Sequence, residues 1–412
     1  MSTFLYYENL IILFKQINLF KNLKCVIMNG IYYYVIAFIL IWTIAIVFKN
    51  QLTDHGVEVN FPLLMWRTQR LRGFIDRLAN RAPRFWKWYM NIGIVISTGF
   101  MILMAVALVY SLKTLMETPS VSLIVPGVEV PGSPIYIPLL AGLIALATVL
   151  IVHEFSHGIL SRVEKININS IGLLLFAIIP GAFVEPDEEE LNELSRPAKM
   201  RIYVAGSMAN LTLAAIALII MLVISSFIIP VVFEDDGVVI NRLTSDANAK
   251  DYMSEGMVIR SINNLTVNDM ESFQKATSTL RPNETVNIHT DQGDYSFQLK
   301  SNPMNKSLGF MGIQVNANSV IADGFDNQFY TPLLWILMPL SELLFWIYFL
   351  NFAVGTFNLL PMKPLDGGHL LENLLSYIMP ESAFKPIVTF MSFLMGIIIV
   401  VSLVVGLVGV PF

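Results

Sequence analysis

The sequence predicts a polytopic α-helical membrane protein that carries one small inserted α+β domain. Of the 412 residues, 55% are hydrophobic and only 14% are charged, whereas a soluble domain carries roughly 25% charged residues. A chain this apolar cannot cover itself with polar groups in water, which argues against a cytosolic enzyme, a disordered protein and a collagen-like fibre. The apolar residues also gather in runs of roughly 20, the length that crosses a bilayer as a helix.

Six apolar runs are candidates for transmembrane helices. They are Ile31–Phe48, Tyr89–Leu112, Ile135–Leu160, Ile202–Ile229, Pro332–Phe357 and Pro386–Val410. A further stretch, Ile168–Val184, contains Gly172, Pro180 and Gly181 and is too broken to span. It favours a re-entrant hairpin or a short membrane-embedded β-segment, because such backbone in a membrane must be buried in protein or line a cavity.

Two interpretations of the N-terminal extension, residues 1–30, stay open. Phe4–Phe20 could form an interfacial amphipathic helix. Alternatively, translation starts at Met28, directly before the first span. A cleavable signal peptide is not expected, because no basic region opens the segment and no small-residue cleavage site follows it.

Charge in the loops predicts the orientation. Residues 49–88 carry eight Lys and Arg but only three acids, which places this basic loop in the cytoplasm. Alternation then puts residues 113–134 outside, 185–201 inside, 230–330 outside and 362–385 inside. Three lysines near the N-terminus oppose this assignment unless translation starts after them: Lys15, Lys21 and Lys24.

Residues 231–327 form a more polar segment between two apolar spans, long enough for one small domain. Within it, short apolar runs are separated by turn signals. The runs that read as strands are Val238–Ile240, Met257–Ile262, Val286–His289 and Tyr295–Leu299. Asp269–Leu280 reads as an amphipathic helix, with four apolar residues on a common face: Met270, Phe273, Ala276 and Leu280.

The run Gly256-Met-Val-Ile-Arg-Ser-Ile-Asn-Asn264, followed by Val267 and that helix, resembles a PDZ domain. The later Leu308-Gly-Phe-Met-Gly-Ile313 resembles the closing strand of PDZ domains in membrane proteases. The organisation we expect comprises the N-terminal extension (1–30), the first span (31–48), the basic loop (49–88), a membrane core in two parts (89–230 and 328–412) and the PDZ-like insertion (231–327).

The third span ends in an HExxH motif, His153-Glu154-Phe155-Ser156-His157. Residues i and i+4 share a helix face, so both imidazoles can reach one zinc ion, and Glu154 can take the proton of an attacking water. In soluble helices the same pattern is often only a solvated polar face. Here it ends a run, Ile135–Ile151, that has no charged residue, and ionisable groups in such a setting are usually functional.

A second segment offers the remaining ligand. It reads Asn358-Leu-Leu-Pro-Met-Lys-Pro-Leu-Asp366-Gly367-Gly368 and follows an apolar run. A catalytic zinc needs three protein ligands and one open position, and Asp366 can be the third. The two glycines permit a tight turn beside it. Taken alone, the segment could be an ordinary Pro/Gly loop at a helix end.

Together, the motifs HExxH and NxxPxxxxDG resemble those of the site-2 protease family of intramembrane zinc metalloproteases, over roughly residues 135–385. The resemblance implies that His153, His157 and Asp366 bind zinc and that Glu154 is the catalytic base. It also implies that Asn358 lies beside the cleft, where it holds substrate or the developing oxyanion. The broken stretch Ile168–Val184 would match the region that engages substrate as an added strand.

A further family motif, Gly-Pro-x-x-Asn, is partly matched by Gly206-Ser207-Met-Ala-Asn210, with Ser207 in place of proline. Asn210 then either helps to close the catalytic core or simply bonds the backbone of a neighbouring helix. Of the three other histidines, His55 and His289 are expected at the surface. His369, three residues after Asp366, is expected to be structural, with a supporting role behind the metal ligands as the alternative.

The expected function is hydrolysis of a peptide bond within or beside a transmembrane helix of a membrane-anchored protein. The chain would be a multi-pass cell-membrane protein with its site near the cytoplasmic side and the PDZ-like domain outside, binding a substrate stub or excluding bulky ectodomains. The net charge of −5 gives no general attraction to nucleic acid, and a single cysteine, Cys25, excludes an intramolecular disulfide framework.

Three alternatives remain. One is an inactive adaptor acting through the PDZ-like domain, which the intact Glu154 disfavours. Another is a membrane zinc protease that cuts soluble or misfolded proteins, which the apolar setting of His153 disfavours. A transporter is the third, although no inverted repeat supports it.

Overall fold

The computed structural model describes residues 30–69, 71–113, 135–243, 248–302, 306–322 and 331–408, with positions 121, 123–128, 130, 133, 324 and 325. The expectations for residues 1–29 therefore lie outside the described residues. The chain divides into two compact units, one that contains residues 222–342 and one, the helical unit, that contains residues 26–221 and 343–412.

Among the described residues, five helices are long and apolar enough to cross a membrane. They are α5 (Pro83–Tyr110), α6 (Leu139–Val163), α9 (Ala205–Val223), α12 (Thr331–Phe357) and α14 (Glu381–Val408). The expected first span is also an apolar helix, α2 (Gly30–Val47), but it is shorter. These helices agree with a polytopic membrane protein, while the count of six spans stays a prediction.

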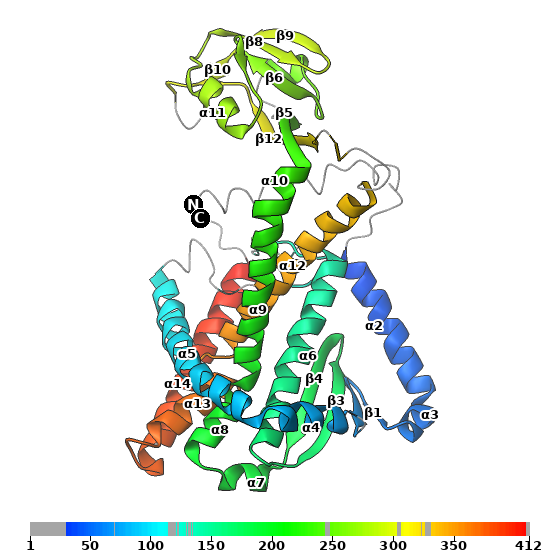
Figure 1. Ribbon diagram of the computed structural model, residues 1–412, viewed down its shortest axis with the longest axis vertical. Helices are drawn as coiled ribbons and strands as arrows, with labels where there is room; N and C mark the ends of the chain where they lie inside the picture. Colours follow the sequence, from blue (N-terminus) through cyan, green and yellow to red (C-terminus); the bar gives the residue numbers. More distant parts are fainter. Residues whose placement is uncertain are drawn as a thin grey trace. The chain divides into compact units, whose positions relative to one another are not determined.

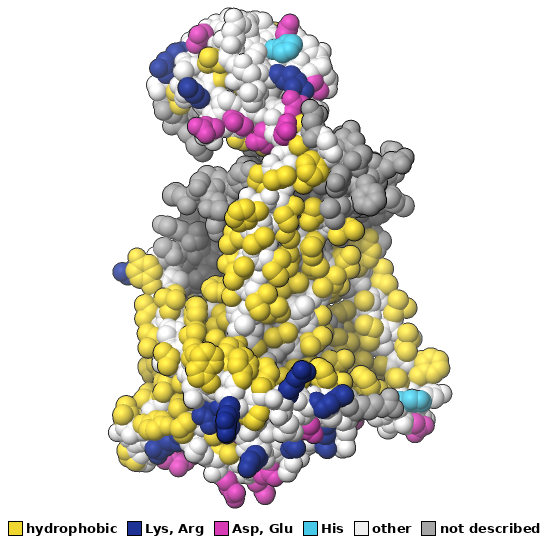
Figure 2. Space-filling model, in the orientation of Figure 1, with side chains coloured by type: hydrophobic (Ala, Val, Ile, Leu, Met, Phe, Trp, Pro, Cys, Tyr) yellow, Lys and Arg dark blue, Asp and Glu magenta, His cyan; other side chains and the backbone are white. Residues whose placement is uncertain are grey.

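On the face that Figure 2 shows, the described side chains along the helices are mostly apolar. Val95 on α5 is 72% exposed and Leu140 on α6 is 73% exposed, as expected of residues that face lipid. Lys and Arg gather at one end of the helical unit, where α4 (Arg72–Arg81), α7 (Glu188–Glu193) and α8 (Arg196–Tyr203) lie (Figures 1 and 2). Two further short elements precede α6, the α-helix α3 (Lys49–Asp54) and the 3₁₀ turn η2 (Ser111–Lys113).

A four-stranded antiparallel sheet stands beside α6. Its order is β1 (Val57–Asn60), β2 (Leu63–Thr68), β3 (Ile168–Phe176) and β4 (Ile179–Pro186). The broken stretch expected at Ile168–Val184 is thus a hairpin, turning at Ala177 with a positive φ of 56°. The segment expected only as a basic loop contributes the two other strands as well as α3 and α4. Strand β4 ends the sheet on the side of α6.

A hydrophobic core joins α4, α5, α6, α8, α9 and β3 to α13 (Asp366–Leu375). Ile75 of α4, Leu160 of α6 and Leu370 of α13 are all completely buried in it. Beside this core, Glu164 at the end of α6 bonds Arg201 at 2.7 Å and Lys87 at 3.0 Å. Burial raises the pKa of Glu164, but these two cations outweigh it and hold the pKa below its ordinary value.

The second unit contains a sheet in the order β12 (Ile313–Ile321), β5 (Phe233–Leu243), β6 (Val258–Ile262), β8 (Thr285–Thr290) and β9 (Gly293–Gln298). The short strand β7 (Leu265–Thr266) pairs with β6. Strands β10 (Lys300–Ser301) and β11 (Gly309–Phe310) pair with each other in a separate two-stranded sheet. The unit also holds the π-helical turn η3 (Ile224–Ile228), α10 (Ile229–Val232) and the 3₁₀ turn η4 (Asn248–Asp251). All four runs expected as strands overlap strands of this sheet.

Helix α11 (Met270–Ser278) covers the core of this sheet, close to the range expected from its amphipathic pattern. Of the four apolar residues assigned to its buried face, Phe273, Ala276 and Leu280 are buried and Met270 packs against the same core. Its N-cap, Asp269, accepts a hydrogen bond from the Ser272 amide at 2.7 Å. An α+β unit is therefore present, and its PDZ identity remains a resemblance.

Candidate metal centre

His153 and His157 lie one turn apart on α6, with ring centroids 4.8 Å apart. The Nδ1 atom of His157 is 2.8 Å from the carbonyl oxygen of Ile202. A carbonyl only accepts, so Nδ1 of His157 carries the proton and its Nε2 presents a lone pair. That lone pair faces Nε2 of His153 at 3.2 Å, a separation that fits either an N–H···N hydrogen bond or a cation shared by the two nitrogens.

Asp366 is the first residue of α13, and the loop before the helix brings it to the histidines. The Gly367 amide donates to the carbonyl of Asn358 at 2.8 Å, which folds the loop back on itself. A Cβ on Gly367 would lie 2.2 Å from the Leu359 carbonyl oxygen, and one on Gly368 would lie 2.5 Å from the Met362 backbone. Only glycine fits at either position, so the two glycines after Asp366 have a steric role.

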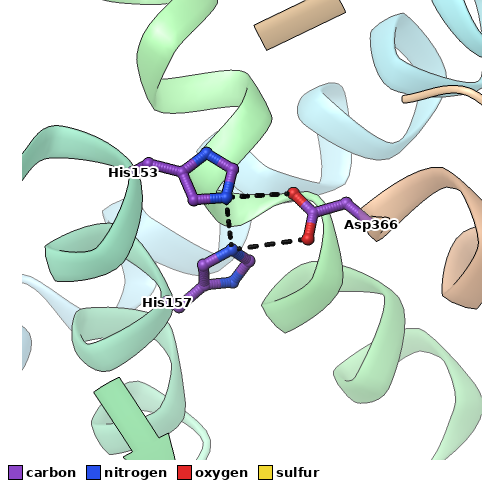
Figure 3. A group of neighbouring side chains, drawn as sticks. All are labelled: His153, His157 and Asp366. Carbon is purple, nitrogen blue, oxygen red and sulfur yellow. Dashed lines mark hydrogen bonds and ion pairs between the residues drawn. The ribbon is translucent and has the colours of Figure 1, made fainter. Parts of the chain in front are cut away.

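The three side chains converge as Figure 3 shows. One carboxylate oxygen of Asp366 lies 3.5 Å from Nε2 of His153, and the other lies 3.5 Å from Nε2 of His157. The three ligand atoms lie within 4.8 Å of one another. Tetrahedral zinc with bonds of 2.0–2.1 Å separates its ligand atoms by about 3.3–3.4 Å. The donor set and its spacing therefore fit a zinc ion.

Helix α9 closes over the cluster because Gly206 has no side chain. A Cβ at this position would lie 2.5 Å from Nε2 of His157 and 2.6 Å from Nε2 of His153. Ser207 is completely buried and donates its hydroxyl proton to Oδ2 of Asp366 at 2.8 Å. These contacts of Gly206 and Ser207 were not expected from the sequence, where the only signal was a partial match to a motif.

Asn210, one turn further along α9, bonds Nδ1 of His153 at 3.3 Å. Its Oδ1 atom is buried without a partner among the described residues. Rotating the amide by a half-turn would place Oδ1 against Nδ1 of His153 as an acceptor. His153 would then donate from Nδ1 and keep the lone pair of Nε2 for a metal, which is the usual arrangement for a metal-binding histidine.

Comparison with known sequences agrees with this geometry. The model of peptidase family M50 matches residues 141–402, from the helix of the histidines to α14. The chain belongs to peptidase family M50. The matched segment contains the cluster of His153, His157 and Asp366, which provides a possible metal site.

Two similar sequences extend this comparison. The chain is 29% identical over 237 residues to an uncharacterized protein of Methanocaldococcus jannaschii. It is 26% identical over 211 residues to a membrane-bound transcription factor site-2 protease homolog of Arabidopsis thaliana. The matches cover 57% and 50% of this chain, and 57% and 40% of the two relatives. The chain thus matches about half the length of these relatives.

In this M50 chain, the side chain of Glu154 contacts the sheet. Its Oε2 atom accepts a hydrogen bond from the Val184 amide of β4 at 3.2 Å. Asn358 contributes its backbone carbonyl to the turn before Asp366. The side chain of Glu154 therefore joins α6 to the strand that ends the sheet, one residue away from the first histidine.

The other three histidines lie apart from the cluster's ligand atoms. His369 stacks on Tyr203, with ring centroids 4.9 Å apart and planes at 21°. His55 bonds the carbonyl of Gln51 in its own helical turn. His289 is 55% exposed and pairs with Asp294 at 2.5 Å. These contacts are structural or at the surface, as expected.

Proposed function

We propose that this chain is a zinc metalloprotease of the site-2 protease type, which hydrolyses a peptide bond within or beside a transmembrane helix of a membrane-anchored substrate. The observation that carries the proposal is the convergence of His153, His157 and Asp366 from α6 and α13, with ligand spacing that fits zinc. Their side chains are only 12–16% exposed. A shielded site of this kind on a lipid-facing helix suits a substrate that is itself in the membrane.

Each residue has a role in this chemistry. His153, His157 and Asp366 would hold the metal, and Ser207 and Asn210 would orient two of these ligands. Zinc bound there would polarise the scissile carbonyl and make a water more acidic. Glu154 takes the proton of the attacking water and passes it to the leaving amine. In this assignment Asn358 binds the substrate or the developing oxyanion.

Strand β4 provides a place for the substrate backbone. It is an edge strand of the sheet and lies against α6. The hydrogen bond from the Val184 amide to Glu154 attaches this strand to α6. An extended peptide that adds to the edge of a sheet gains main-chain hydrogen bonds, so a substrate helix has to unwind before it is cut. Such a strand would run past Glu154, the proposed base.

The proposed orientation follows the distribution of charge. The basic segments around α4 and α8 would face the cytoplasm, and the metal centre would lie near that side. Under the same assignment the PDZ-like unit is extracytoplasmic, where it binds a substrate stub left by an earlier cleavage or excludes bulky ectodomains. Regulated intramembrane proteolysis is the process that this arrangement would serve.

The proposal is tested with the purified full chain in lipid nanodiscs, by measuring bound zinc and cleavage of a reporter with one transmembrane helix. Glu154→Gln should keep zinc and lose cleavage, while Glu188→Gln on the exposed helix α7 should retain both. Asp366→Asn should lower the zinc content. Cleavage that persists in Glu154→Gln would exclude the proposed mechanism, and an inactive wild-type chain with zinc bound would favour the adaptor alternative.

A further inference from the structure

Four Asn-x-Ser/Thr triplets occur in the chain, and the fold places them in different surroundings. Such a triplet, with any residue except proline in the middle, is the acceptor sequence for N-linked glycosylation. The four begin at Asn210, Asn264, Asn283 and Asn305. Asn210 is completely buried in the apolar helix α9, and Asn305 lies outside the described residues. Asn264 and Asn283 both belong to the unit that contains residues 222–342.

Asn264 lies in the tight turn that joins β6 to β7. Asn263 and Asn264 are the two residues between these strands, with positive φ angles of 46° and 65°, as a two-residue hairpin turn of type I′ requires. Asn264, Leu265 and Thr266 are all exposed. Asn263 accepts a hydrogen bond through its side chain from the Asn287 amide at 2.8 Å. The side chain of Asn264 bonds no other described residue, so its amide nitrogen is open to reaction.

Asn283 lies in a second exposed turn, Arg281–Glu284, just before β8. Its φ of 63° is left-handed, a conformation that asparagine tolerates better than most residues. Gln298 donates to the Asn283 carbonyl at 2.9 Å, which fixes the backbone, whereas the Asn283 side chain bonds no other described residue. Glu284 and Thr285 are exposed as well. The whole triplet is therefore accessible.

The two acceptors lie at the same end of the sheet. Strand β6 ends at the turn of Asn264, and the antiparallel strand β8 begins just after Asn283. The Asn263 amide donates to the Asn287 carbonyl and the Asn287 amide donates to Asn263 Oδ1, each at 2.8 Å. These bonds hold the turn of Asn264 beside the start of β8. Groups attached to the two asparagines would therefore extend from one end of this unit.

Turn geometry accounts for the asparagines but not for the residues that follow them. Asn263 is also exposed and left-handed, yet the second residue after it is Leu265, whereas Asn264 and Asn283 are followed at that distance by threonine. The three segments assigned to the cytoplasm, residues 49–88, 185–201 and 362–385, each contain asparagine but no Asn-x-Ser/Thr triplet. The accessible triplets thus occur in the unit that the charge distribution places outside the cell.

We propose that Asn264 and Asn283 are N-glycosylated on the extracytoplasmic side of the membrane. The inference rests on the proposed orientation of the PDZ-like unit and not on the protease chemistry. The donor is a lipid-phosphate-linked oligosaccharide, transferred by an enzyme of the host membrane. The side-chain nitrogen bonds to C1 of the first sugar, while the bond from C1 to the phosphate oxygen breaks. The lipid phosphate leaves with that electron pair and the nitrogen loses one proton, so the transfer needs neither oxidant nor reductant.

The test uses the full chain purified from membranes of the cells that naturally produce it. Its proteolytic peptides are analysed by mass spectrometry with fragmentation, which assigns an added mass to a single residue. We expect a saccharide on Asn264 and on Asn283, and none on Asn263 or Asn210. Asn263 is exposed but has no triplet, whereas Asn210 has a triplet but is buried. Unmodified Asn264 and Asn283 would overturn the proposal.

Variants in the same turns locate the modification. Asn264→Gly and Asn283→Gly preserve the turns because glycine accepts positive φ, and each should remove one saccharide unit from the mass of the chain. Asn263→Gly is the matched control and should remove none. Thr266→Ser should keep the modification of Asn264, whereas Thr266→Ala should lose it. A saccharide that stays on Asn264 in Thr266→Ala would show that the triplet is not the acceptor signal.

A separate measurement distinguishes a wrong site from a wrong orientation. The single cysteine, Cys25, is replaced by serine, and a Ser278→Cys substitution is made on the exposed side of α11. A membrane-impermeant maleimide should label this chain on intact cells. Labelling only after the cells are opened would overturn both the proposed orientation and the glycosylation. Labelling on intact cells together with unmodified Asn264 and Asn283 would overturn the glycosylation alone.

Discussion

The hydroxyl of Ser207 donates to Oδ2 of Asp366 at 2.8 Å and so connects α9 to α13. The same oxygen lies 3.5 Å from Nε2 of His153, while Oδ1 lies 3.5 Å from His157. The bond thus sets the rotation of the carboxylate so that one oxygen faces each histidine. Because Ser207 is completely buried, no water competes for its proton, and the orientation of Asp366 depends on this contact.

Replacing Ser207 by alanine should weaken metal binding without unfolding the chain. The loss of a hydrogen bond that orients a ligand typically lowers metal affinity by roughly 10–100-fold. Zinc affinity is measured by competition with a chelator in detergent. Ser156→Ala is the matched control, because the Ser156 hydroxyl bonds the Val152 carbonyl of its own helix. Equal zinc affinities of the two variants would contradict a role for Ser207 in orienting Asp366.

Asn210 gives a second prediction about ligand orientation. Asn210→Leu removes the partner of Nδ1 of His153, so the ring loses its fixed tautomer, and zinc affinity should again fall by roughly 10–100-fold. Asn210→Asp keeps an acceptor for Nδ1 and should retain more affinity than the leucine variant. Isotope-labelled His153 can be followed by NMR to read the tautomer directly.

The control for Asn210 is another buried asparagine on a membrane helix. Asn351 of α12 is also completely buried, and its Oδ1 atom has no partner within the described part of the chain, but its amide nitrogen bonds Thr148 and not a histidine. Asn351→Leu should therefore alter stability and leave zinc affinity unchanged. If it lowers zinc affinity as much as Asn210→Leu does, the effect is a general one of buried amides.

A methyl group at Gly206 should separate α9 from the metal centre. The added Cβ would lie 2.5 Å from Nε2 of His157, well inside van der Waals contact, so either the ring or the helix has to move. Gly206→Ala should therefore lose both zinc and reporter cleavage. Gly99→Ala on α5 meets no atom of the described residues within 4 Å and should keep both. Normal zinc content in Gly206→Ala would mean that the cluster can shift without loss.

Some of this site was predictable from spacing alone, because the four-residue separation of His153 and His157 puts them on one face of any helix. Asp366 was a candidate for the third ligand because zinc needs three, but only the resemblance joined it to the histidines, since nothing local connects Asp366 to residues more than 200 positions earlier. The contact of Ser207 with Asp366 depends on how closely α9 approaches α6, which is a tertiary distance. A partial motif indicated the segment but not this bond.

The four-stranded sheet was likewise predictable only in part. The broken run at Ile168–Val184 predicted a hairpin or β-segment because its glycines and proline interrupt any helix. Strands β1 and β2 were missed because a four-residue strand such as Val57–Asn60 carries little signal, and β2 pairs with β3 more than 100 residues away. The excess of arginine in this region was read as an orientation signal, whereas Arg72 also lines a cavity with Arg162 of α6.

The N-cap of α11 supplies a prediction for the PDZ-like unit. Asp269 accepts from the Ser272 amide, and this hydrogen bond lowers the pKa of Asp269 below its ordinary value. Asp269→Ala should destabilise the helix by about 1 kcal/mol, while Asp269→Asn, which also caps well, should lose only a few tenths. Hydrogen exchange of the α11 amides in the full chain, corrected for intrinsic rates, measures the difference.

The direction of the pH dependence follows from the lowered pKa of Asp269. The charged cap contributes its full stability above about pH 4, the ordinary pKa of an unfolded aspartate, and loses it as the pH falls through the lower folded-state pKa. Wild-type α11 should therefore lose protection at acidic pH, whereas the helix of Asp269→Asn, which has no titrating cap, should lose less. Parallel pH profiles of the two chains would show that other carboxylates, and not this N-cap, control the acid stability of the unit.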